Sequence, residues 1–200
     1  MDYGGINIYS LKVERRDNNI KARKLRRNGI IPASIYGRNL KESVLIQIPL
    51  PDVNGLLGKV SKGNRLTIEV DGQKYNVIFK NITREPVRQQ VEHIEFQHIV
   101  ADEAVNSVVK VVLTNKEKNE NIIQQHIEEI PYNALPRNFV QEIVLDVEGL
   151  KAGSIVKIED LDIAKNQNIR LTIPEDTVIV TVAERKRMLI EEETDEEQDS

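Results

Sequence analysis

The chain has 200 residues, enough for one large domain or two small ones. Hydrophobic residues make up 40% of it and cysteine is absent, so we expect a globular protein without disulfides or thiolate chemistry. The formal net charge of −4 hides an asymmetry, because residues 1–97 carry 17 basic and 10 acidic residues (net +7) and residues 98–200 carry 11 and 22 (net −11). A basic half favours a polyanionic partner.

The N-terminal ten residues show no basic leader followed by an apolar stretch, and no apolar run approaches the ~20 residues of a membrane-spanning helix. We therefore expect a cytoplasmic protein that makes no membrane contact.

The basic half is predicted to fold as strands with one or two helices. Asn18 and Asn19 are plausible caps for a short helix at Lys21–Arg27, which Gly29 would end. A second helix is expected between Pro51 and Val60. Asp71-Gly72 predicts a tight type I′ hairpin turn. The expected strands are residues 6–14, 33–36, 44–48, 66–70, 74–79 and 92–96.

The acidic half is predicted to be almost entirely β, as a sandwich or open barrel. Its expected strands are residues 105–113, 122–130, 139–147 and 178–182. The change of charge near residues 97–103 predicts a domain at 1–97 and a second at 98–187. The end of the chain, EEETDEEQDS, is too acidic to bury a core, so we expect a disordered tail at 188–200.

A dense cationic cluster is the first candidate site. Eight basic residues fall between positions 12 and 27, offset only by Glu14 and Asp17. On a short helix Arg23, Arg26 and Arg27 share one face, which suits a phosphate backbone. The alternative is an ordinary solvated helix face. The cluster comprises Lys12, Arg15, Arg16, Lys21, Arg23, Lys24, Arg26 and Arg27.

Two further segments carry candidate RNA-reading side chains. Tyr36-Gly37-Arg38 offers an aromatic ring that can stack on a base, although a half-buried strand tyrosine is the simpler interpretation. In His93-Ile94-Glu95-Phe96, strand alternation puts His93 and Glu95 on one face. A carboxylate facing RNA is useful only where it accepts from base N–H groups, and the alternative is a cross-strand pair with Lys or Arg.

Catalytic and metal-binding patterns are weak. The sequence lacks a nucleophile elbow, a phosphate-binding loop, a dinucleotide fingerprint and a zinc-protease motif. A metal site from His93, Glu95 and His98 would need convergence that one strand does not give. We expect no enzyme activity, no cofactor, no metal and no small-molecule substrate.

These stretches together resemble the bacterial 5S-rRNA-binding large-subunit ribosomal protein family number twenty-five, in its long two-domain form. The resemblance covers nearly the whole chain except the tail. It rests on residues 24–33 (KLRRNGIIPA), 35–37 (IYG) and 93–96 (HIEF), and in the second half on residues 135–137 (LPR), 145–153 (LDVEGLKAG) and 174–177 (PEDT).

The resemblance implies a mostly β protein with a few helices, an N-terminal six-stranded β-barrel-like domain on 5S rRNA and a β-rich second domain. Neighbouring large-subunit proteins or RNA would be the other partners. The family usually has Asp where this chain has Glu95, and a Gly-rich turn where it has residues 118–121. Carried over by motif, the RNA-contacting residues would be Arg16, Arg26, Tyr36, His93 and Glu95, and the cationic cluster adds Lys21, Arg23 and Arg27 to the expected RNA-binding residues.

Two other functions remain open on sequence grounds. One is a stress-associated protein that binds RNA away from the ribosome and uses its acidic half to bind proteins. The other is a small hydrolase or transferase with an unrecognised site, which converging carboxylates in a cleft would favour.

Overall fold

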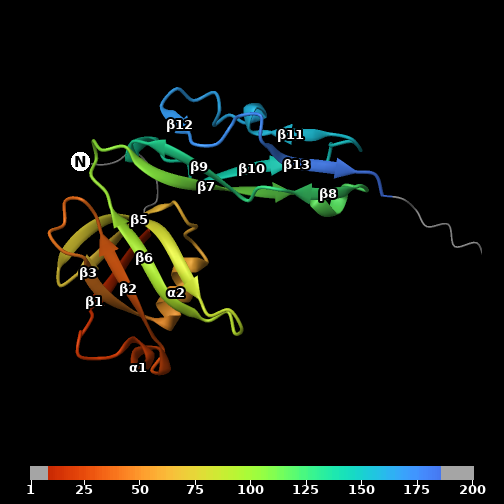
Figure 1. Cartoon of the computed structure of the whole chain (residues 1–200). Coiled ribbons are helices and arrows are strands. Elements are labelled where there is room, and N and C mark those ends of the chain that lie inside the picture. The colour runs from red at the N-terminus through yellow and green to blue at the C-terminus, as the bar shows by residue number, and fades with distance from the viewer. Residues whose placement is uncertain (1–8, 186–200) are drawn as a thin grey trace, which may run out of the picture.

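A computed structural model describes residues 9–185, which form an N-terminal barrel (residues 9–98) and a β-rich C-terminal part, the C-terminal sheets (residues 105–183) (Figure 1). The mostly β fold with few helices confirms the predicted class. The predicted acidic tail lies outside the described residues.

The barrel is a closed six-stranded sheet in the order β1-β3-β2-β6-β5-β4. β1 pairs with β4, and β2 with β6, in parallel, whereas the other neighbours are antiparallel. Alternate apolar residues of every strand fill its interior, as period-two patterning requires. This confirms the predicted six strands. They are β1 (Tyr9–Arg15), β2 (Ile30–Tyr36), β3 (Val44–Pro49), β4 (Arg65–Val70), β5 (Gln73–Arg84) and β6 (Val91–His98).

Two helices accompany the barrel, α1 (Ala22–Arg27) and α2 (Leu50–Leu57). The predicted caps of α1 are wrong, because Lys21 is the N-cap residue and no side chain caps it. Asp17 instead accepts from the Asn19 N–H at 2.8 Å and forms a turn before the helix. No helix within residues 9–185 is long and apolar enough to cross a membrane.

The turn between β4 and β5 has the predicted geometry. Asp71 and Gly72 have φ of 52° and 80°, both positive as a type I′ turn requires. The Asp71 carboxylate also accepts from Arg15 Nε at 3.1 Å. One cation of the predicted phosphate-binding cluster is therefore engaged with the barrel itself.

The C-terminal part contains a four-stranded sheet, β10-β7-β9-β12, and a three-stranded sheet, β11-β13-β8. Side chains from both sheets form one core, so the part is a small sandwich. Its strands are β7 (Val105–Thr114), β8 (Ile122–Gln125), β9 (Glu129–Ala134), β10 (Glu142–Asp146), β11 (Ile155–Lys157), β12 (Ile169–Leu171) and β13 (Val178–Ala183). Three short 3₁₀ helices interrupt it at Lys116–Lys118, Pro136–Asn138 and Ile158–Asp160.

The single strand predicted at residues 122–130 is wrong. β8 pairs with β13 in the smaller sheet, whereas β9 pairs with β7 in the larger one. The chain changes sheets between them, where the His126 N–H donates to the Ile179 carbonyl at 2.8 Å. The Gln125 side chain donates to the carbonyls of Val111 and Ile127, both at 3.1 Å, and ties the crossing to both sheets.

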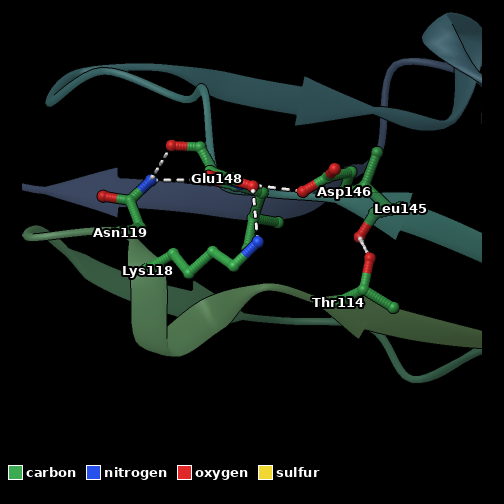
Figure 2. Close-up of polar contacts among 7 residues, drawn as sticks. Thr114, Lys118, Asn119, Leu145, Asp146 and Glu148 are labelled. Carbon is green, nitrogen blue, oxygen red and sulfur yellow. Dashed lines mark hydrogen bonds and ion pairs between the residues drawn. The ribbon is translucent and has the colours of Figure 1, made fainter.

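The loop at residues 115–121 fastens the turn that follows β10 (Figure 2). The Asn119 side-chain amide donates to the carbonyls of Val147 at 2.6 Å and Leu150 at 2.9 Å. Asp146 accepts from the Glu148 N–H at 3.0 Å, and this bond lowers the pKa of Asp146. Residues 118–121 therefore stabilise this turn through hydrogen bonds.

The barrel and the C-terminal sheets meet at a close contact between residue 63 and β7. The buried Ser107 hydroxyl donates to the Gly63 carbonyl at 2.9 Å. Gly63 has φ of +87°, and a Cβ there would lie 1.8 Å from the Val108 carbonyl oxygen. Only glycine fits such a position.

Further contacts surround this junction. Ile78 of β5 is fully buried within the core of the C-terminal sheets rather than inside the barrel. Lys62 pairs with Glu129 at 3.2 Å, and Lys80 donates to the Asn106 carbonyl at 2.8 Å. Burial, reinforced by the charge of Lys62, lowers the pKa of Lys80. The two parts therefore pack together through apolar and polar contacts.

Candidate nucleic-acid interface

Two surfaces of the barrel hold six of the eight RNA-binding residues that the sequence predicts. The first is the outer face of β2 and β6, called here the strand face, and the second is a groove beside α1, called here the basic groove. α1 and the β5–β6 connection lie at the end of the barrel away from the C-terminal sheets (Figure 1).

The strand face follows from the alternation of β6. Ile94 and Phe96 are fully buried in the barrel, whereas His93 and Glu95 are half-exposed on its outside. The predicted common face of His93 and Glu95 is thus confirmed. β2 runs parallel beside β6 with Ser34 opposite Glu95, which adds Ser34 and Tyr36 to the same face.

Glu95 is a carboxylate without a cation. Its neighbours across the strands are Ser34 on β2 and Asn81 on β5, both neutral. Within residues 9–185 no hydrogen bond or ion pair engages its side chain. The alternative of a cross-strand pair with Lys or Arg is therefore wrong, and the acceptor oxygens of Glu95 remain available.

The other groups on the strand face are arranged around this carboxylate. The His93 Nε2 lies 3.2 Å from the Ser34 hydroxyl oxygen, so Ser34 rather than Glu95 orients the imidazole. Burial, together with the negative charge of Glu95, raises the pKa of Tyr36. Tyr36 is consequently a neutral phenol at physiological pH and can donate or accept a hydrogen bond.

The basic groove lies between α1 and the β5–β6 connection and has a volume of about 660 Å³. Leu25 is buried against the barrel and anchors the helix, which directs its basic residues outward. The helix contributes three arginines to the lining, and the end of β5 and the β5–β6 connection contribute one each. These are Arg23, Arg26, Arg27, Arg84 and Arg88.

The arginines of the groove differ in how they are held. Arg26 pairs with Glu92 at 3.3 Å, and Arg84 donates to the Gln89 carbonyl at 3.1 Å. The guanidinium groups of Arg23, Arg27 and Arg88 contact no carboxylate among the described residues. Five arginines and two carboxylates, those of Glu85 and Glu92, line the groove, so it keeps a net positive charge that attracts phosphates.

Sequence patterns do not single out Arg84 and Arg88. Arg84 ends β5 and Arg88 lies in the polar connection that follows it, where basic residues are spaced too widely to form a cluster. The signal that identifies them is spatial, because the β5–β6 hairpin brings them opposite α1.

Two of the predicted cations occupy other positions. Arg16 is half-buried, and its Nη2 donates to the Ile20 carbonyl at 3.2 Å. It therefore holds the segment before α1. Lys21 is exposed at the N-cap of α1 and does not line the basic groove.

The structure does not gather metal ligands. His98 lies two residues after Phe96 and therefore on the same side of β6 as Ile94 and Phe96. Its ring meets the Tyr75 ring edge-on, with the two ring centroids 6.0 Å apart. It thus points away from His93 and Glu95. No group of three or more potential ligands converges within the described part of the chain.

Comparison with known proteins places these features in context. Residues 11–96 match the "Ribosomal L25p family", and residues 104–186 match "Ribosomal protein TL5, C-terminal domain". The chain is similar to the large ribosomal subunit protein bL25 of Dictyoglomus thermophilum, with 31% identity over 96% of this chain and 98% of the relative. The bL25 of Agrobacterium fabrum is 33% identical over 94% and 96%, and that of Finegoldia magna 26% identical over 94% and 91%.

Proposed function

Since this chain belongs to the bL25 family of large ribosomal subunit proteins, we propose that its barrel binds 5S rRNA through the basic groove and the strand face. Family membership makes the chain a structural ribosomal protein and not an enzyme, associated with the ribosome in the bacterial cytoplasm. Family membership does not name the RNA partner, and 5S rRNA is our proposal for it.

The observation that carries this proposal is the basic groove, where Arg23, Arg27 and Arg88 pair with no carboxylate of residues 9–185. Such groups position a protein on a nucleic-acid backbone but carry no sequence information. The positive charge of Arg26 is partly neutralised by its ion pair with Glu92. Lys21 and Arg16 add positive charge near one end of α1.

Recognition of a particular RNA is assigned to the strand face. RNA-binding sheets stack bases on aromatic rings and bind base edges and 2′-hydroxyls in shallow or irregular regions. Tyr36 offers a ring and a hydroxyl, and His93 offers a ring nitrogen. Glu95 accepts from base N–H groups, in a setting where a phosphate would be repelled.

Substitution of one free arginine tests the electrostatic part of this proposal. We expect Arg27→Ala to weaken 5S rRNA binding and to make the slope of log affinity against log salt shallower by roughly one unit. Gel-shift titrations at several salt concentrations give this slope. Arg170→Ala, an exposed arginine of β12, is the matched control with an expected unchanged slope. An unchanged slope for Arg27→Ala would remove the groove from the interface.

We also propose that residues 1–97 and 98–187 are separate domains and that the first suffices for RNA binding. α1 and the β5–β6 connection, which line the basic groove, lie at the end of the barrel away from the C-terminal sheets (Figure 1). We expect a fragment of residues 1–97 to bind 5S rRNA within about tenfold of the full chain, ~1.4 kcal/mol. Circular dichroism first establishes that the fragment folds, because truncation exposes Ile78. A folded fragment with a larger loss would place the C-terminal sheets on the RNA.

Sequencing of the RNA that co-purifies with the full chain from cells identifies the partner directly. We expect 5S rRNA to dominate. Enrichment of other RNAs, without 5S rRNA, would favour a role away from the ribosome.

A further inference from the structure

A second groove lies on the C-terminal sheets, where the proposed RNA contacts do not reach. It has a volume of about 450 Å³ and runs beside β10. Ile143 and Leu145 of β10 and Leu161, Ile163 and Ile169 opposite them supply apolar walls. Glu142, Asp160 and Asp162 give the same groove three carboxylates.

β10 is an edge of its sheet, and its free edge borders this groove. Among the described strands it pairs with β7 alone, in parallel. The Val147 N–H donates to the Thr114 carbonyl, and the Leu145 carbonyl accepts from the Thr114 hydroxyl (Figure 2). Odd-numbered residues therefore direct their backbone groups toward β7, and Val144 directs its N–H and C=O outward.

The side chains of this edge have a symmetrical pattern. Val144 is 58% exposed, with Glu142 and Asp146 two residues away on each side and on the same face. Ile143 and Leu145 point to the opposite face, toward the core of the C-terminal sheets. On one face, an added strand would thus lie beside an acidic, an apolar and a second acidic side chain. On the other face it would lie beside apolar side chains only.

Charge decides what can occupy the edge. A second copy paired antiparallel about Val144 would put Glu142 opposite Asp146, and like charges directly opposite destabilise a strand pair. RNA phosphates would meet the carboxylates of Glu142, Asp160 and Asp162. The end of this chain has seven acidic residues among its last ten and would be repelled in the same way.

We propose that the free edge of β10 binds an extended segment of another protein with the pattern cation, three apolar residues, cation. The segment adds antiparallel as a fifth strand, and its central residue exchanges backbone hydrogen bonds with Val144. Its two cations lie opposite Glu142 and Asp146. Its second and fourth residues enter the apolar groove beside Ile143 and Leu145.

The experiment uses the full chain and a fluorescent peptide, Gly-Ser-Lys-Val-Ile-Val-Lys-Ser-Gly, followed by fluorescence anisotropy. A matched peptide carries Glu in place of both Lys. We expect saturable binding of the lysine peptide, at least about tenfold tighter than that of the glutamate peptide. Methylation of the backbone nitrogen of the central Ile should weaken binding at least tenfold, because it blocks the bond to Val144 without altering the protein.

Protein variants locate the binding to this edge. Glu142→Lys should weaken binding of the lysine peptide and strengthen binding of the glutamate peptide. Glu128→Lys makes the same charge change on the other side of β7, ahead of β9, and should leave both affinities unchanged. Val144→Pro should abolish binding, and the methylated peptide supplies the same information if that variant does not fold.

Three outcomes would overturn the proposal. One is the absence of saturable binding of the lysine peptide. Another is equal binding of the methylated and unmethylated peptides, which would leave only a charge attraction. The third is a concentration-dependent dimer that Glu142→Lys alters, because the edge would then bind a second copy of the chain.

Discussion

Gly63→Ala is expected to destabilise the protein by about 2–5 kcal/mol, because two unfavourable effects coincide at this residue. The backbone has φ of +87°, and the added Cβ would lie 1.8 Å from the Val108 carbonyl oxygen. That oxygen belongs to β7, so neither side can move without disturbing the Ser107–Gly63 hydrogen bond. Urea denaturation followed by circular dichroism measures the loss.

Gly153→Ala is the matched control, since Gly153 has φ of +84° but no atom within 4 Å of the added Cβ. It should cost only the conformational penalty, about 1–2 kcal/mol. The difference between the two variants isolates the contact between the barrel and β7. Equal losses would mean that the two parts separate freely and that this contact contributes nothing.

Glu95→Ala should lose about 1–3 kcal/mol of affinity for 5S rRNA, the scale of one good base-edge contact. The same substitution should leave binding to a generic duplex RNA unchanged or slightly improved, because a negative charge is removed. The reason is that Glu95 pairs with no cation in the described part of the chain, so its removal should weaken binding only to a partner that donates a hydrogen bond to it. Parallel titrations of both RNAs at one salt concentration measure the contrast.

Glu42→Ala controls for the removal of a carboxylate as such, because Glu42 is exposed in the β2–β3 connection and is not one of the outward-facing residues of β2 and β6. We expect this substitution to change the affinity for both RNAs by a similar, small amount. The assignment of Glu95 to recognition is withdrawn if its substitution also changes both affinities equally, or changes neither.

Local chemistry made part of the fold predictable. Asp71-Gly72 specifies its turn because few residues accept positive φ at two successive positions. The alternation of residues 93–96 specified which side chains face outward, because one face had to enter a core. Patterns of this kind depend only on neighbours in the chain.

Other features depend on partners that the sequence does not reveal. The strand predicted at residues 122–130 is divided between two sheets. Its alternation of apolar and polar residues hardly changes at the break, because the position of the break depends on which strands lie beside it. Arg84 and Arg88 join α1 only through the hairpin that carries them. The pairing of Arg26 with Glu92 joins distant segments in the same way.

The parallel pairing of β2 with β6 has a consequence for the order of synthesis. Ser34 emerges from the exit tunnel long before Glu95, so the strand face does not exist until nearly the whole barrel has been made. α1, by contrast, needs only nearby residues for its backbone bonds. A nascent chain therefore presents its basic segment before it has formed the strand face, to which we assign RNA recognition, and that face is complete only when β6 closes the barrel.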